Sequence, residues 1–188
     1  MTIILGSASP RRRELLSQLG VEFSVASPDI DETPRHGESP TDYVRRLAVE
    51  KSHAVRSPAD ALVITADTTV DLGGEILGKP VDSEEAASML RRLSSRTHRV
   101  HTGVALRRDT HVVVEVVTSL VTFTPLTPAA IEWYVGTGEP LDKAGAYAVQ
   151  GAGGVFVHRV RGSVSNVVGL PLHTVAKLAA ELGSPLVG

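Results

Sequence analysis

Two arginines occupy the start of a predicted helix. Residues 7–16 read SASPRRRELL, in which Ser9 is a favourable N-cap residue and Pro10 suits the first helical position. A helix N-terminus already carries a partial positive charge, so Arg11 and Arg12 should destabilise it slightly unless an anion binds there. The exposed backbone amides and the two guanidinium groups together indicate a phosphate site.

The helical wheel separates the three arginines of this segment. At about 100° per residue, Arg12 falls near the centre of the face that Leu15 and Leu16 would bury, whereas Arg11 falls at its edge. Arg13 points away from that face. Arginines on a buried face commonly extend along apolar surface or pair with acids, so the phosphate interpretation depends on the capped helix start beside them.

A second predicted helix, over residues 40–55, carries a lysine in its apolar stripe. Leu47 and Ala48 belong to the stripe, and Lys51 lies in its middle by the same angular count. Lysine is almost never fully buried without a partner. Its ammonium group is therefore expected either to reach solvent or to enter a cleft that holds an anion.

Acidic residues could complete a site for polyphosphate chemistry. Asp67 follows the apolar run 62–64 at the end of a predicted strand, where α/β sheets present functional groups, although an aspartate there caps a turn about as often. Beside cationic groups, Asp67 would bind a metal or activate water, and Glu32 would supply a second oxygen ligand. Lys79 would act on a phosphate as a point charge.

Three other patterns do not support the chemistry they suggest. Residues 73–79, GGEILGK, have Walker A spacing, but Pro80 follows where Ser or Thr is required and the middle of the segment reads as a strand. The seven histidines show no zinc-like spacing on a helix. Ser163 and Ser165 have no evident base and no G-x-S-x-G elbow, so a serine hydrolase is not indicated.

The elements that must position these residues mix βα units with a hairpin. Alternating and apolar runs predict strands over residues 2–5, 21–25, within 59–72, over 75–77, 99–123 as an antiparallel pair, and 155–160. Amphipathic patterns predict helices over 10–19, 40–55, 83–93, 128–135 and 172–182, with residues 161–166 as a loop. This order predicts an α/β fold with a mixed sheet.

Composition limits the functional classes. The 188 residues are 42% hydrophobic and carry a net charge of -2, which suits one compact domain, or one domain in two lobes. Near-neutral charge and 4% aromatic residues argue against a nucleic-acid partner. The absence of cysteine excludes disulfides, and no signal peptide or membrane segment is visible, so we expect a cytoplasmic protein without a membrane partner.

Taken together, the motifs resemble those of the Maf family of nucleotide pyrophosphatases, which is related to the inosine triphosphatase-like fold. The match spans nearly the whole chain. It includes the S-x-S-P-R-R opening at Ser7, Ser9, Pro10, Arg11 and Arg12, the R-L-A-x-x-K helix from Arg46 to Lys51, A-D-T at 66–68, Lys79-Pro80, the segment 139–147, Gln150-Gly151 and N-V-V-G-L-P at 166–171.

The resemblance implies a single domain over residues 1–188, with an elongated twisted sheet flanked by helices and two lobes around a cleft. It also implies hydrolysis of a nucleoside triphosphate between the α and β phosphates, with Mg²⁺ or Mn²⁺ as cofactor. Substrate would be bound by Ser7, Ser9, Arg11, Arg12, Lys51, Thr68, Lys79 and Gln150, the metal by Glu32 and Asp67, with Asp67 also at the position of the proton acceptor.

The segment DKAGAYAVQG resembles the branch of the family that acts on dTTP and UTP. In that branch Arg11, Thr68 and Gln150 occupy the positions associated with substrate choice. Ala148 departs from the glycine that is common in relatives, so the base preference follows less firmly than the chemistry. The resemblance does not separate a role for Asp67 as base from one as metal ligand.

Two other functions stay open on sequence alone. The sister branch of the family acts on 7-methyl-GTP, and damaged or modified nucleotides are further candidate substrates. A non-catalytic nucleotide-binding regulator of cell division would share the arginines and lysines but would not need Asp67. Family members often dimerise, so a homodimer is an expected partner that the sequence itself does not establish.

Overall fold

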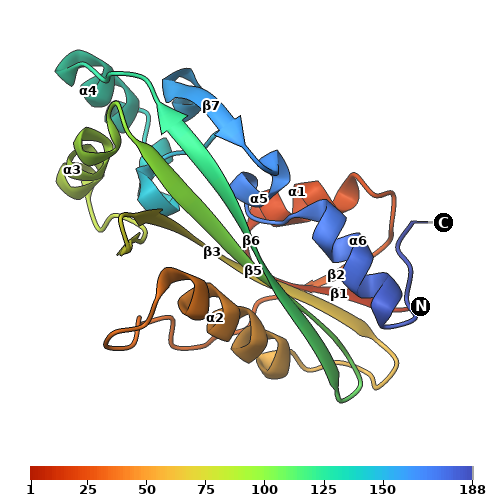
Figure 1. The fold of residues 1–188 in the computed structure, drawn as a ribbon. Coiled ribbons are helices and arrows are strands. Elements are labelled where there is room, and N and C mark those ends of the chain that lie inside the picture. Colours follow the sequence, from red (N-terminus) through yellow and green to blue (C-terminus); the bar gives the residue numbers. More distant parts are fainter. Residues whose placement is uncertain (188) are drawn as a thin grey trace. The chain divides into compact units, whose positions relative to one another are not determined.

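The computed structural model describes residues 1–187 and alternates helices with strands (Figure 1). In chain order the elements are β1 (Ile3–Gly6), α1 (Pro10–Ser17), β2 (Ser24–Ala26), α2 (Pro40–Ala54), β3 (Leu62–Leu72), β4 (Glu75–Leu77), α3 (Ser83–Leu93), β5 (Thr97–Arg108), β6 (His111–Phe123), α4 (Pro128–Gly136), the 3-10 helices η1 (Glu139–Asp142), η2 (Ala144–Ala146) and η3 (Ala152–Phe156), β7 (Val157–Arg161), α5 (Val164–Val168) and α6 (Leu172–Glu181).

The described strands form one mixed sheet. Its order is β2-β1-β3-β5-β6-β7, and β4 pairs with β3 beside this path. β1 lies parallel to β2 and β3, whereas the pairs β3–β4 and β6–β7 are antiparallel. The mixed α/β fold predicted from the order of the elements is therefore confirmed. Among residues 1–187, no helix combines the length and apolar character needed to span a bilayer.

Two compact units make up the chain. The first unit comprises Met1–Asp67, Thr102–Val117 and Gly169–Gly188, and the second comprises Thr68–His101 and Thr118–Val168. Strands β3, β5 and β6 each contribute residues to both units.

The first unit contains a topological switch point at the end of β1. Leu5 of β1 is in register with Val25 of β2 on one side and with Ile64 of β3 on the other. The crossover through α1 runs from β1 to β2, and the crossover through α2 runs back from β2 past β1 to β3. Right-handed crossovers in opposite directions place their helices on opposite faces, and Figure 1 shows α2 on one face and α1 with α6 on the other. Ligands of open α/β sheets bind at such a reversal, beside the carboxyl ends of the strands.

Close packing fixes α2 against the sheet of the first unit. A Cβ atom at Gly103 of β5 would lie 2.2 Å from the backbone oxygen of Val44, so only glycine allows this approach. The buried Thr65 hydroxyl of β3 also donates to the Ala48 carbonyl of α2, at 2.7 Å. The rotation of α2 is thereby set, and with it the direction in which its polar side chains point.

The second unit has an aromatic core. Phe123 and Tyr147 meet edge to face with ring centroids 4.8 Å apart, and Tyr134 meets Phe156 in the same way at 5.2 Å. Tyr134 is completely buried. Each of these buried side chains contributes roughly 1.5–3 kcal/mol through the hydrophobic effect, so the core anchors α4 and the segment around Tyr147.

Three local expectations were wrong in detail. β2 begins at Ser24 rather than at residue 21, because the residues in register with β1 are Ser24–Ala26. Ser9 is the N-cap residue of α1, but its side chain makes no capping hydrogen bond. Residues 164–168 form α5 where a loop was expected, since Ser163 caps the amide of Asn166, whose side chain donates to Val100 of β5.

Candidate active site

Lys51 lies between two carboxylates in the first unit. Its Nζ atom is 2.6 Å from Asp67 Oδ1 and 2.7 Å from Glu32 Oε1. Lys51 and Asp67 are each only 7% exposed, whereas the side chain of Glu32 is about half exposed. Lys51 therefore does not extend into solvent, and the anions that its ammonium group contacts are carboxylates of the protein itself.

Burial makes Asp67 an unusual carboxylate. Removal from water raises the pKa of Asp67, and the nearby Lys51 and Arg12 charges oppose that shift. Asp67 lies on β3, two residues beyond the register partner of Gly6, and so lies just past the end of β1. A carboxylate with a raised pKa at this place is suited to accept a proton while the cations favour its ionised form.

Ser7 organises the start of α1. Its hydroxyl accepts from the Ser9 amide and from Arg12, each at 3.2 Å. Arg12 also donates through Nε to the Gly169 carbonyl, at 2.8 Å. Burial lowers the pKa of Arg12, and Asp67 and Glu32 raise it in opposition. The guanidinium of Arg12 therefore lies in the electrostatic field of Asp67 and Glu32. Its inward direction agrees with the prediction from the helical wheel.

The remaining residues of this helix start also have defined positions. Ser9 and Arg11 are partly buried, whereas Arg13 is exposed, as the wheel indicated. The predicted residues Ser7, Arg12, Glu32, Lys51 and Asp67 all belong to the first unit.

Two side chains of α2 hold the loop that carries Glu32. The Tyr43 hydroxyl donates to the Glu32 carbonyl at 2.9 Å, and Arg46 donates to the Thr33 carbonyl at 3.2 Å. Arg46 also binds both oxygens of Glu38, which lowers the pKa of Glu38 to about 2. The sequence did not reveal either anchor, because their partners lie on a loop whose position no helical pattern predicts. The available signal was Arg46, five residues before Lys51 in the R-L-A-x-x-K motif.

Three predicted residues lie in the second unit. Thr68 is partly buried, and Lys79 and Gln150 are exposed. The Gly145 amide donates to the Gly78 carbonyl at 3.0 Å, which joins the segment before Gln150 to the residue before Lys79. The predicted substrate-binding residues are thus divided between the two units.

The buried histidines have protein partners in the second unit. His98 Nε2 lies 2.8 Å from the Tyr147 hydroxyl. His101 Nε2 lies 3.1 Å from Asp71, and its Nδ1 lies 2.8 Å from the Thr118 hydroxyl. His101 thus links β5 to β3 and β6, and His98 links β5 to Tyr147 in the segment before Gln150.

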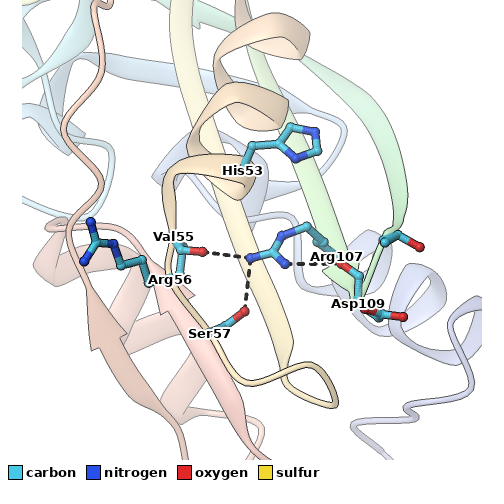
Figure 2. A pocket seen from close by; sticks show the side chains of 7 residues that line it. His53, Val55, Arg56, Ser57, Arg107 and Asp109 are labelled. Carbon is cyan, nitrogen blue, oxygen red and sulfur yellow. Dashed lines mark hydrogen bonds between the residues drawn. The ribbon is translucent and has the colours of Figure 1, made fainter.

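A cavity of about 510 Å³ in the first unit lies apart from the predicted residues. Figure 2 shows Arg107 at its centre, donating to Val55, Ser57 and Asp109. The same guanidinium donates through Nε to the Ser52 carbonyl. Because Arg107 closes the end of α2 with these bonds, we assign the cavity a structural role.

Glu32 and Asp67 are oxygen donors of the kind that a divalent cation binds. Both present a carboxylate oxygen to a single point, now the Lys51 ammonium group. Within residues 1–187 no cluster of three or more His, Cys, Asp or Glu side chains could bind a metal ion. Two carboxylates with completion by phosphate oxygens are typical of Mg²⁺ sites, so the donor set suits Mg²⁺ or Mn²⁺ rather than zinc.

The fold and this cluster define an α/β protein with buried charges at its switch point. The Maf-like protein family model matches residues 2–182. A dTTP/UTP pyrophosphatase of Myxococcus xanthus (strain DK1622) is 57% identical over 98% of this chain and 94% of its own length. One from Shewanella oneidensis is 48% identical, with 97% and 99% covered. The chain belongs to the Maf family.

A solved structure shares the fold at low sequence identity. The HAM1 protein from Coxiella burnetii aligns with a TM-score of 0.52 and 15% identity, over 96% of this chain and 99% of that chain. At this identity the similarity concerns the fold alone.

Proposed function

We propose that this protein hydrolyses dTTP and UTP to the nucleoside monophosphate and pyrophosphate. The observation that carries the proposal is the buried Asp67, which lies within 2.6 Å of Lys51 and in the field of Arg12 at the switch point. The names of relatives that are about half identical over nearly the full length support the same substrates.

The chemistry requires positioning and charge neutralisation more than covalent catalysis. Ser7, Ser9, Arg11 and Arg12 would bind phosphates at the start of α1, with Lys51 and Lys79 adding positive charge. The attacking water forms a bond to phosphorus, the bridging bond between the α and β phosphates breaks, and the proton of the water passes to Asp67. Thr68 and Gln150 would contact the pyrimidine or ribose.

Glu32 and Asp67 would hold the divalent cation. When bound, that cation supplies a Lewis acid that neutralises phosphate charge and polarises the phosphorus. The chain's own contribution is to keep both carboxylates in place: Tyr43 fixes the backbone of Glu32, and β3 fixes Asp67.

A nucleotide panel tests the proposal. With Mg²⁺ or Mn²⁺ present, we expect pyrophosphate as first product and the highest kcat/KM for dTTP and UTP. Orthophosphate as first product would contradict the proposed bond of cleavage, and a preference for 7-methyl-GTP would assign the chain to the other substrate class. Binding of dTTP without turnover would favour a nucleotide-binding regulator.

Three further expectations belong to the same proposal. The chain would act as one Maf-like domain over residues 1–188, in the cytoplasm where pyrimidine nucleoside triphosphates are used. A homodimer stays a prediction, which light scattering at several protein concentrations would check.

A further inference from the structure

Gln150 lies in a tight turn of the second unit. The Gly151 amide donates to the Ala148 carbonyl at 3.3 Å, so Val149 and Gln150 are the two central residues. The Gln150 side chain is exposed. A residue at the tip of a turn is held only as firmly as the two ends of that turn.

One tyrosine–glutamate pair holds both ends. The Tyr134 hydroxyl of α4 donates to Glu139 Oε1 at 2.6 Å and accepts from the Ala148 amide at 3.1 Å. Beyond Gln150, Glu139 accepts from the Ala152 amide at 3.0 Å and from the Gly153 amide at 3.1 Å. The amides on the two sides of Gln150 therefore converge on a single phenol and carboxylate.

Two glycines permit this close approach. A Cβ atom at Gly151 would lie 2.2 Å from Glu139 Oε2, and one at Gly153 would lie 2.6 Å from the Tyr134 hydroxyl oxygen. Both distances are far shorter than any real carbon–oxygen contact. The G-x-G spacing after Gln150 is thus explained by contact of the backbone with the pair rather than by a phosphate.

Protonation states agree with the hydrogen-bond directions. Burial, followed by the neighbouring Glu139, raises the pKa of Tyr134, which remains a donor. Burial of Glu139 would raise its pKa, but bonds from Tyr134, Gly153 and Ala152 hold the pKa below its ordinary value. An ionised carboxylate that accepts three hydrogen bonds is a strong anchor.

We infer that Tyr134 and Glu139 are positioning residues that fix the turn of Gln150 and thereby set the preference for dTTP and UTP. This inference rests on the proposed function, because it needs Gln150 to contact the base. Thymine and uracil present an acceptor next to a donor, and a carboxamide can match that pair only when its backbone is held at a constant distance. In this role both residues act through the turn that they bind.

A double-mutant cycle tests the coupling to Gln150. We expect Glu139→Gln to lower kcat/KM for dTTP by about tenfold, since the amide group cannot accept from all three donors, and to change dCTP hydrolysis little. In a Gln150→Ala background, Glu139→Gln should change kcat/KM by less than about twofold. Glu132→Gln, at an exposed glutamate of α4, is the matched control and should behave as the native protein.

Hydrogen exchange measures, without turnover, how firmly Tyr134 and Glu139 hold the turn of Gln150; we call this pair the clamp. In Glu139→Gln and in Tyr134→Phe, the amides of Ala148, Ala152 and Gly153 should exchange faster, with an unchanged pattern in the control. Tyr134→Phe retains the aromatic core and so serves as the second variant if Glu139→Gln folds poorly.

The outcomes separate the inference from the proposed function. Equal losses on dTTP and dCTP, or equal losses with and without Gln150, would overturn the positioning role and leave the activity intact. Unchanged exchange at these amides would overturn the clamp itself. A native protein that releases pyrophosphate from no nucleotide would overturn the proposed function and the selectivity role, while the exchange result would still decide whether the pair holds the turn.

Discussion

The two units hold their candidate residues in different ways. In the first, charged side chains on α2 and β3 contact one another directly, with Lys51 between Asp67 and Glu32. In the second, Gln150 lies on a turn whose position depends on backbone amides bound to Glu139 and Tyr134. The first arrangement acts through charge and the second through geometry.

This difference predicts different consequences of substitution. A buried charge that loses its partner is costly in stability and changes the chemistry. A backbone clamp that loses one hydrogen bond changes the position of a neighbouring residue by a small amount. Variants of the first unit should therefore affect turnover and stability most, and variants of the second unit should affect selectivity.

Asp67→Asn should have the largest effect. Asparagine preserves size but cannot accept the water proton, so kcat for dTTP should fall by about 10³-fold. Pyrophosphate release measures turnover, and calorimetry with a non-hydrolysable analogue should show retained binding. Asp60→Asn, at an exposed aspartate before β3, is the control. Equal turnover in Asp67→Asn would eliminate the catalytic role of Asp67.

Lys51→Met should affect stability most. It leaves the buried Asp67 without its ammonium partner, so the free energy of unfolding should fall by about 3–5 kcal/mol. The double variant Lys51→Met with Asp67→Asn should recover part of that loss, because the orphaned charge is gone. Urea unfolding measures both changes. The exposed Lys177→Met should lose at most about 1 kcal/mol, and a similar loss in Lys51→Met would refute a buried ion pair.

His98 should produce an acid-dependent loss of stability in the second unit. Burial lowers the pKa of His98 to about 4, so below the ordinary histidine pKa the unfolded chain binds the proton more readily. The contribution of the neutral His98 to the free energy of unfolding should be complete above pH 6.5. It should fall by up to about 3 kcal/mol towards pH 4. The free energy of unfolding, measured with urea, should not show this acid-dependent loss in His98→Phe. The exposed His158→Gln should still show it. Identical slopes in all three proteins would contradict it.

Tyr43→Phe should have the smallest effect of the four. It removes the hydrogen bond to the Glu32 carbonyl but leaves α2 packed, so the Glu32 loop should become more mobile. We expect a roughly threefold higher metal concentration for half-maximal activity, with kcat little changed. Ser17→Ala, which also removes an exposed hydroxyl, is the control. A fall in kcat without a metal effect would argue against the anchoring role.

Local patterns predicted much of the fold. The apolar stripe predicted α2 almost residue for residue, and the order of the elements predicted a hairpin, which β3 and β4 form. Residues 164–168 escaped prediction because their helix depends on Asn166 reaching Val100, far away in the sequence. Contacts between distant residues leave no periodic signal.

Sequence alone determined the types of residue present and the surfaces on which they fall: inward Arg12, Lys51 in an apolar stripe, Asp67 at a strand and a family motif around Gln150. Only tertiary structure decided their partners. The pairing of β1 with both β2 and β3 creates the switch point, the loop anchored by Tyr43 brings Glu32 to Lys51, and Tyr134 meets Glu139 beneath the Gln150 turn. Helix and strand periods specify which face a side chain occupies, whereas its partner depends on how separate elements pack.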